Sequence, residues 1–420
     1  MTVAGALQWA VLALCASMLL THATLAAGVL VARLRDRRDE ARRRRRPSGR
    51  RNAPPVSVVV AAMNEEQALP RLLDSLAAQT TGAFELVLVD DRSTDATGAL
   101  MERHRAAAPY PVRVVRNRRP PEDCTGKQQA LDLGVAAAGG DLLLFTDADC
   151  TVPPTWVERL TAYFTADAGG RTGVVFGQLA VQAPGGSGSG SGFGGSGDGD
   201  RTEGAAARGP DRFTDRYQAF DQPLVHQYST GSAGLGQPTG CFGNNLALRA
   251  PVLAGIGGFR SLGYTITEDA ALIGAASRAG WKVRASTLAE TMVTTEPQPD
   301  WRAFINQHVR WNGGAFYSSD PAAAWGYRYV TLFLILSVAA APFALLVPWL
   351  VVWPLTSLVS IGTLAALAAA LYHPRRRRAL ARVVPYTLFF MGFYAYITVL
   401  AIAGVRAEWK GSRLPATHAP

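Results

Sequence analysis

The stretch LLLFTDADCTVPP, residues 142–154, decides the fold class that the sequence predicts. Four apolar residues lead into Thr146, and Asp147 and Asp149 follow with one alanine between them. A short apolar run is typical of a buried strand in a parallel sheet, and in open α/β sheets ligands bind beyond the carboxyl ends of the strands. The two carboxylates therefore predict a cation site, and the alternative is a solvated turn, where aspartate is common.

Two earlier segments repeat this arrangement. VSVVVAAMN ends at Asn64 with Glu65 directly after it, and ELVLVDD ends in Asp90 and Asp91. Carboxylates crowded on one edge of a sheet repel one another, so a cation is expected to offset them. Because Mg²⁺ is typically held by one or two carboxylates together with substrate phosphates, the pattern predicts Mg²⁺ or Mn²⁺ bound with a diphosphate.

Strands and helices alternate through this part of the chain, which predicts a parallel α/β sheet with right-handed crossovers. The predicted strands are 56–64, 85–91, 112–117 and 141–149. The helix after the second strand is expected to be capped by Ser93 or Thr94. The turn AMNEEQ lacks a GxGxxG motif, which argues against a dinucleotide-dependent oxidoreductase. None of the four cysteines forms a CxxC pair, which argues against zinc and redox motifs.

Three segments carry no charged residue and are predicted to meet a membrane. They are 1–32, 329–372 and 383–405. Since a spanning helix needs about 20 apolar residues, we expect one span, two spans and one span respectively. The first is expected to be an uncleaved anchor, because its apolar run is too long for a signal peptide and no positive region precedes it.

The net charge of +10 has a local cause, because residues 33–51 hold eleven arginines against three acids. The positive-inside rule places this segment in the cytoplasm, at the inner membrane, with the N-terminus outside. Its position after a span favours anionic lipid headgroups as its partner. No aromatic residue is interleaved in it, so the pattern does not indicate nucleic-acid binding.

The chain is expected to divide into five parts. These are an anchor (1–32), a basic cytoplasmic linker (33–53), a catalytic domain (54–327) with a flexible Gly/Ser insert (184–210), about three membrane segments (328–405) and a tail (406–420). Four complete spans would place the tail outside, although RAEWKGSRLP carries three positive charges. One later apolar segment is therefore spanning, interfacial or re-entrant, and the sequence leaves these alternatives open.

In order along the chain, VSVVVAAMNEE, LVLVDDRSTD, GKQQALDLG and LLLFTDADC, followed by GYTITEDAAL and QHVRW, resemble the family 2 glycosyltransferases. The resemblance covers about residues 54–315 and extends to membrane-bound enzymes with a QxxRW block, such as ceramide glucosyltransferase-like enzymes and processive synthases. It implies a GT-A nucleotide-sugar-binding fold, a UDP-sugar as the donor, and a divalent metal. The tail resembles a WKGR-like segment interrupted by a serine.

The resemblance also implies roles at the donor side. Asp90 and Asp91 would contact the nucleoside and a phosphate edge, and Lys127 would lie near the uracil or the diphosphate. Asp147 and Asp149 would position the metal and the sugar diphosphate. Asn64 and Glu65 would lie at the same edge of the site.

On the acceptor side, Asp269, preceded by Glu268, would be the general base. The other implied residues are Gln307, Arg310 and Trp311, closing over the diphosphate and the acceptor entrance, and Asn244 and Asn245, in the segment before the TED block. One base without an enzyme nucleophile implies a single displacement with inversion. The alternative for Glu268 and Asp269 is a helix N-terminus, where acids are favoured, and Trp311 has an alternative as an interfacial aromatic.

The acceptor remains open between three classes. The later apolar segments hold few polar residues for a polysaccharide channel, which favours a hydroxyl-bearing lipid over a processive synthase. An isoprenoid phosphate is the third class, and it would need no base. A glycosidase would need two carboxylates flanking a bond and no diphosphate site, and a non-catalytic scaffold would leave the acidic strand ends without a purpose.

Overall fold

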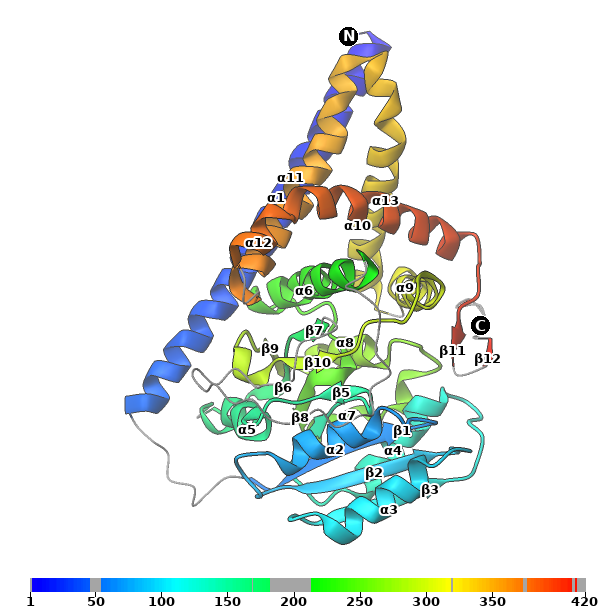
Figure 1. Cartoon of the computed structure of the whole chain (residues 1–420). Coiled ribbons are helices and arrows are strands. Elements are labelled where there is room, and N and C mark those ends of the chain that lie inside the picture. Colours follow the sequence, from blue (N-terminus) through cyan, green and yellow to red (C-terminus); the bar gives the residue numbers. More distant parts are fainter. Residues whose placement is uncertain are drawn as a thin grey trace.

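The computed structural model describes residues 2–45, 54–167, 169–181, 213–318, 320–372, 376–409 and 412–413. The predicted Gly/Ser insert lies outside the described residues. Between α1 and the later membrane helices, the chain forms a sheet domain with helices on both faces (Figure 1).

The central sheet has seven strands in the order β3-β2-β1-β4-β8-β6-β9. Their bounds are β1 Val56–Ala62, β2 Glu85–Asp91, β3 Val112–Asn117, β4 Leu142–Phe145, β6 Thr172–Phe176, β8 Leu246–Arg249 and β9 Lys282–Ala285. All neighbouring pairs are parallel except those of β8, which runs antiparallel to β4 and β6. The predicted, mostly parallel sheet is confirmed, and β2, β1 and β4 lie side by side with their carboxyl ends at one edge.

The strand predicted at 141–149 is shorter than expected. β4 ends at Phe145, and Cys150 begins β5 (Cys150–Thr151), which belongs to a second sheet with the order β5-β10-β7. The other strands of that sheet are β7 Leu179–Val181 and β10 Val293–Thr295. Asp147 and Asp149 therefore lie in the bend between the two sheets.

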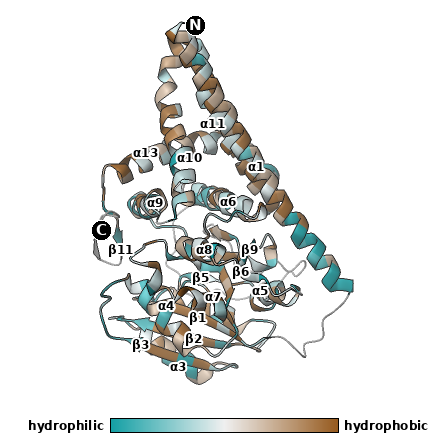
Figure 2. Cartoon of the chain, turned by 180° about the vertical axis from the view of Figure 1, so that it is seen from behind, coloured by the Kyte–Doolittle hydropathy of each residue, from teal (hydrophilic) through white to brown (hydrophobic). Residues whose placement is uncertain are grey.

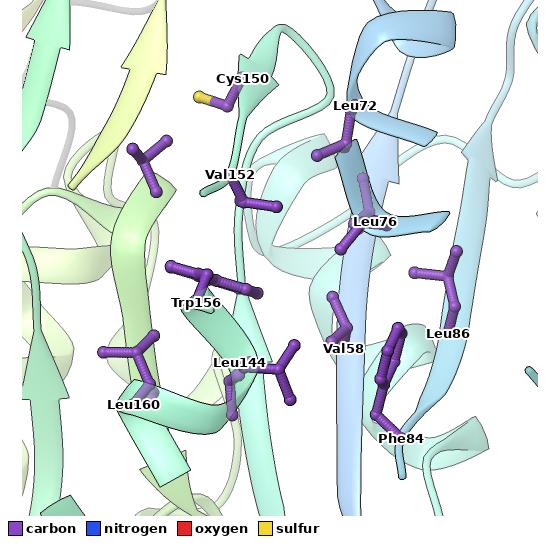
Figure 3. Close-up of a cluster of buried hydrophobic side chains, with 14 of the residues drawn as sticks. Val58, Leu72, Leu76, Phe84, Leu86, Leu144, Cys150, Val152, Trp156 and Leu160 are labelled. Carbon is purple, nitrogen blue, oxygen red and sulfur yellow. The ribbon is translucent and has the colours of Figure 1, made fainter. Parts of the chain in front are cut away.

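One face of the central sheet is covered by α2 (Leu69–Ala77) and α5 (Trp156–Thr165). Pro70 lies in the first turn of α2, where its missing N–H costs no hydrogen bond. Leucines of α2 and the indole of Trp156 pack with Val58 and Leu144 of the central strands (Figure 3). This apolar layer holds β1 and β4 in register, and so fixes where their polar ends lie.

The opposite face is covered by α4 (Gly126–Ala137), α7 (Ala250–Ile256) and α8 (Glu268–Arg278). Thr125 and Gln128 form a reciprocal capping box that begins α4 directly beside Lys127. The cap predicted for α3 (Thr97–Ala107) is wrong, because Ala96 precedes it without a side-chain cap. Ser93 and Thr94 instead bond Asn64, in the loop after β1.

α1 is one helix from Val3 to Arg45, so the described part of the predicted linker 33–53 is helical and continues the membrane anchor. The helix turns from brown to teal along its length in Figure 2, and its basic half lies beside the sheet domain. Buried Asp36 accepts hydrogen bonds from the backbone N–H and the hydroxyl of Thr287 and forms an ion pair with Arg284. Arg159 bonds Glu40 one turn further along. These contacts with the sheet domain stabilise the helical conformation of residues 33–45.

Four described helices are long and apolar enough to cross a membrane. They are α1, α10 (Pro321–Ala340), the segment Pro348–Tyr372 that contains α11 (Val352–Tyr372), and α13 (Val383–Ile402). Short helices lie between them, η5 Pro342–Leu345 and α12 Arg376–Ala381, and η6 Pro348–Val351 begins the segment that contains α11. α1, α10 and α11 rise together from the sheet domain, whereas α13 runs across their base (Figure 1).

α6 (Phe213–Gly234) and α9 (Trp301–Phe316) lie between the sheet domain and the membrane helices (Figure 1). α6 meets α1 where Gly28, Gly231 and Gly234 leave no room for side chains: a Cβ on Gly28 would lie 2.1 Å from the carbonyl oxygen of Gly231. After α13, the chain returns to α9. The side chain of Asn306 donates to the carbonyl oxygen of Glu408 and accepts from its N–H. Glu408 begins β11 (Glu408–Trp409), which pairs with β12 (Ser412–Arg413).

Candidate functional site

A cavity of about 530 Å³ begins at the acidic edge of the sheet and reaches the membrane helices. Its inner end is lined by residues after β1, β2 and β4, and its outer end by residues of α1, α6, α10, α11 and α13. The polar strand ends that the sequence places together thus meet at one end of a cavity whose other end is built by apolar helices.

The strand ends contribute Glu65, Asp91, Asp147 and Asp149 to the cavity wall. Asp91 is held by Arg92, whose guanidinium donates to both carboxylate oxygens at 2.9 Å. Arg92 has a φ of 59°, a left-handed conformation that folds the loop back on the carboxylate. Asp91 is therefore a fixed hydrogen-bond acceptor at the innermost part of the cavity.

Lys127 connects two of the sequence blocks. Its Nζ lies 3.0 Å from Asp147 and 3.1 Å from Glu268, so the ammonium bridges the end of β4 and the start of α8. Although burial opposes it, the charges of Asp147, Glu268 and Asp269 raise the pKa of Lys127, which keeps it cationic at every physiological pH. A buried cation at this place lowers the repulsion between the carboxylates and a diphosphate.

Asp149 faces the cavity without an ion-pair partner among the described residues. Withdrawal from bulk solvent, followed by the charges of Asp147 and Glu65, raises its pKa to about 6. No cluster of three or more His, Cys, Asp or Glu side chains in the described part of the chain forms a complete metal site. The donor set fits a cation held by one or two carboxylates and the phosphates of a ligand, the mode typical of Mg²⁺.

Asp269 lies in the first turn of α8, half-buried in the cavity wall. The backbone N–H of Gly243 donates to its Oδ2 at 2.6 Å, and the N–H of Ala270 donates to its Oδ1 at 2.8 Å. Burial, followed by the charge of Glu268, raises its pKa to about 6 despite these bonds. A carboxylate with this pKa is ionised at neutral pH and basic enough to take a proton from a hydroxyl group.

α9 presents Gln307, Arg310 and Trp311 to the cavity, because residues three and four positions apart share one helical face. Burial lowers the pKa of Arg310, and the nearby charges of Glu268, Asp147, Asp269 and Asp149 oppose this shift. A guanidinium in this position matches the oxygens of a phosphate group.

α9 is held in place by a buried pair that sequence reasoning missed. His308 Nε2 lies 2.9 Å from Asp221 Oδ2 of α6, with both side chains fully buried, and Nδ1 lies 2.9 Å from the carbonyl oxygen of Phe304. Asn312 then donates to the carbonyl oxygen of His308 and also contacts Tyr327 of α10. The face that carries Arg310 is thus tied to α6 and α10.

Three predicted site residues do not line the cavity. Asp90 points away from Asp91 because side chains alternate along a strand, and it accepts a bond from the N–H of Ser93. Asn64 accepts from Thr94 in the neighbouring loop. Asn245 is fully buried. The structure therefore gives these three side chains positions in the framework of the site.

Hydrogen bonds explain why Asn245 is buried while its neighbour Asn244 lines the cavity. Its amide donates to the carbonyl oxygens of Gln178 and Thr291, and its Oδ1 accepts from the indole N–H of Trp156 at 3.0 Å. Asn244, by contrast, lines the cavity, and its buried Oδ1 has no hydrogen-bond partner among the described residues.

The contribution of α6 was also missed by sequence reasoning. Gln218 and Gln222, one turn apart, line the cavity, and Gln218 exchanges two hydrogen bonds with the backbone of Gln298. Both glutamines are buried, whereas the polar composition of the segment suggests a solvated helix. A signal was present in the four-residue spacing of Gln218 and Gln222, which places both amides on one helical face.

Two family models match the chain. "Glycosyl transferase family 2" matches residues 57–190, and "Glycosyl transferase family group 2" matches residues 209–400. Together they span the acidic strand ends, α8, α9, α10, α11 and most of α13, and they leave α1 outside.

Curated relatives match a smaller part of the chain. An undecaprenyl-phosphate 4-deoxy-4-formamido-L-arabinose transferase of Pseudomonas fluorescens (strain Pf0-1) is 36% identical over 111 residues, 26% of this chain and 31% of the relative. The protein of the same name from Proteus mirabilis (strain HI4320) is 35% identical over 118 residues, 27% of this chain and 34% of the relative. The chain spans about a third of the length of these relatives.

Among solved structures, a mannosyltransferase, PcManGT, from Pyrobaculum calidifontis in complex with GDP-Man and Mn²⁺ aligns with a TM-score of 0.51 at 15% identity. The alignment covers 92% of this chain and 99% of that one. This similarity shows the fold, and the GT-A-like architecture expected from the sequence is confirmed.

Proposed function

Because the chain belongs to the family 2 glycosyltransferases, we propose that it transfers a sugar from a nucleotide-sugar, a UDP-sugar, to a lipid acceptor with inversion at the anomeric carbon. The observation that carries this proposal is the single cavity that joins the acidic sheet edge to the membrane helices. A donor diphosphate fits the inner end, and an acceptor from the bilayer fits the outer end.

The donor is held by charges of both signs. Asp91 and Glu65 lie where the nucleoside and a phosphate edge would bind, and Lys127 and Arg310 provide the cations of the cavity wall. Asp149, with Asp147, would hold Mg²⁺ or Mn²⁺, which when bound would neutralise charge on the diphosphate. Since departure of the nucleotide leaves negative charge on the phosphate, Arg310 and Lys127 stabilise the leaving group.

Transfer proceeds by one displacement. The acceptor oxygen forms a bond to the anomeric carbon while the bond from that carbon to the phosphate oxygen breaks, and Asp269 takes the acceptor's proton. Glu268 is occupied by Lys127, which leaves Asp269 as the carboxylate available for this role at the start of α8. Trp311 and Gln307 also line the cavity, where they would close over the diphosphate and the acceptor entrance.

A processive polysaccharide synthase is the alternative within the same family. Its polymer would need a polar lining through the membrane. The outer cavity is instead lined by side chains such as Leu334, Ile361 and Phe390. We therefore favour transfer of a single sugar to a lipid.

We place the catalytic domain and the tail in the cytoplasm and the N-terminus outside the inner membrane. Three helices would span, and α13 would lie at the membrane surface, since 56% of its apolar window is buried against 17–33% for the other three. The bonds between Asn306 and Glu408 keep the tail beside α9. A cysteine in place of Ser412 would then react with an impermeant thiol reagent only in inside-out vesicles; reaction in intact cells would contradict this topology.

The function is tested with membranes from cells that express the chain, incubated with radiolabelled UDP-sugars and Mn²⁺. The expected product is a lipid that carries one sugar, absent when Asp149→Ala replaces the wild type. A ladder of long polymer, or an equal product from the Asp149→Ala membranes, would refute the proposal.

A further inference from the structure

Building on the proposed transfer from a nucleotide-sugar, we infer that the acceptor is an uncharged lipid alcohol and not a lipid phosphate. Its head would lie beside Asp269, Asn244 and Gln222, and its apolar part would lie against the membrane helices that close the outer cavity. Charge, hydrogen bonding and the lining of the cavity support this inference separately.

The cavity wall has far more negative than positive groups. Seven carboxylates line it, against the two cations of Lys127 and Arg310. Asp91 is paired with Arg92, and Glu296 with Arg71, from outside the cavity. Near the start of α8, the wall carries Asp147, Asp149, Glu268 and Asp269.

Both cations are committed to the donor end. Lys127 bridges Asp147 and Glu268, and Arg310 lies in the field of the same carboxylates. A donor diphosphate adds further negative charge, which a divalent cation offsets. A second phosphate at Asp269 would face two adjacent carboxylates without a free cation among the described residues of the wall, whereas a hydroxyl group adds no charge.

Two buried amide oxygens in the cavity wall could accept hydrogen bonds from a ligand. Gln222 Oε1 and Asn244 Oδ1 are buried and have no partner among the described residues, and both side chains line the cavity. Gln222 is only 3% exposed. In the orientation that these two amides have in the structure, the unpaired oxygens can only accept hydrogen bonds, and an ionised phosphate also only accepts them. A hydroxyl group can donate to either oxygen.

The outer cavity fits an apolar chain. Leu25 of α1, Val330 and Leu334 of α10, Ile361 of α11 and Phe390 of α13 line it, and none carries a charge. An acceptor head at Asp269 and a tail against these residues would lie in one continuous space. The presence of a base at Asp269 also fits an alcohol acceptor, because an alcohol must lose a proton to form the glycosidic bond. An ionised phosphate would not need the base.

The chemistry of the product distinguishes the two acceptor classes, whichever lipid the membranes supply. Membranes that contain the protein are incubated with radiolabelled UDP-sugars, and the lipid extract is passed over an anion exchanger and then treated with mild acid. We expect the labelled lipid in the unretained fraction, with its sugar still attached after mild acid. Label that is retained, or released as free sugar, would overturn the inference and leave the proposed function intact. No labelled lipid at all would refute the proposed function itself.

The role of Gln222 has a matched control on the same helix. Gln227 is also buried, and its Oε1 has no hydrogen-bond partner in the described part of the chain, but it does not line the cavity. We expect Gln222→Leu to lower the initial rate of glycolipid formation by about tenfold, as one lost hydrogen bond to a buried group would, and Gln227→Leu to stay within about twofold of wild type. Thermal unfolding checks that each variant is folded, and Asn244→Ala replaces Gln222→Leu if that variant is not. Equal rates in the cavity and control variants would overturn the assignment.

Discussion

Replacement of Asp269 by asparagine separates a base from a structural carboxylate. Asparagine keeps the size of the side chain but cannot take a proton. Its NH2 group replaces one of the two oxygens that accept from Gly243 and Ala270, so one of these bonds is lost in the present geometry. Loss of general-base catalysis typically costs a factor of about 10²–10⁴. We therefore expect kcat to fall at least about a hundredfold while donor binding, measured by calorimetry, is retained.

The dependence of kcat on pH gives a second, independent test of Asp269 as the base. The pKa of Asp269 is raised to about 6, so the protonated form, which cannot act as a base, accumulates below that pH. At saturating donor and Mn²⁺, wild-type kcat should fall about tenfold for each pH unit below 6. In Asp269→Asn the residual kcat should not show this fall below pH 6, which we call the acid limb of the pH profile.

The assay is the initial rate of glycolipid formation between about pH 4.5 and about pH 8.5. Asp132→Asn is the matched control, because Asp132 also accepts bonds from two backbone N–H groups, those of Phe259 and Arg260, but lies outside the cavity. It should lower thermal stability without the loss of kcat. An Asp269→Asn enzyme that keeps more than about a tenth of wild-type kcat, or shows an unchanged acid limb, would refute the reasoning.

Four further outcomes are expected. Asp149→Asn should weaken Mn²⁺ binding, followed by electron paramagnetic resonance, by at least about tenfold. Lys127→Met removes a cation from the carboxylates, so the acid limb of kcat should move to higher pH; no movement would contradict the bridging role. Asp36→Ala breaks a buried pair with Arg284 and should cost about 3 kcal/mol in urea unfolding of detergent-solubilised protein. Gly28→Leu should force α1 from α6 and lower the free energy of unfolding by about 1–3 kcal/mol, measured in the same way.

The strands were predictable because their signal is local. ELVLVDD and VRVVRN form β2 and β3 with the predicted bounds, since short apolar runs that end in polar residues need little tertiary information. The direction of the side chains after those runs was not predictable. Asp90 and Asp91 point to opposite sides, and Asn244 faces the cavity while Asn245 is buried under Trp156, because packing against distant elements decides which side is the cavity.

Two other differences have the same origin. The basic run after the anchor resembles a solvated linker, but Asp36 finds its partners in Thr287 and Arg284, more than 200 positions away. α6 is polar by composition, yet Asp221 is fully buried against His308. In both segments, polar side chains are buried because they form hydrogen bonds or ion pairs with residues far away in the sequence. The residue pattern within a segment does not reveal such distant partners.

The contacts of α1 explain how the cavity is aligned with the membrane. Its apolar half packs on α10 and α11 through Val11, Cys15 and Met18, and its basic half is bound to the sheet domain through Asp36 and Glu40. Because α1 is fixed at both ends, it connects the membrane helices rigidly to the sheet domain. Rotation of one relative to the other would break buried hydrogen bonds or apolar packing. In the proposed transfer the acceptor reaches Asp269 from the bilayer and the donor from the opposite end. This rigid connection would then keep each end of the cavity next to the substrate that enters it.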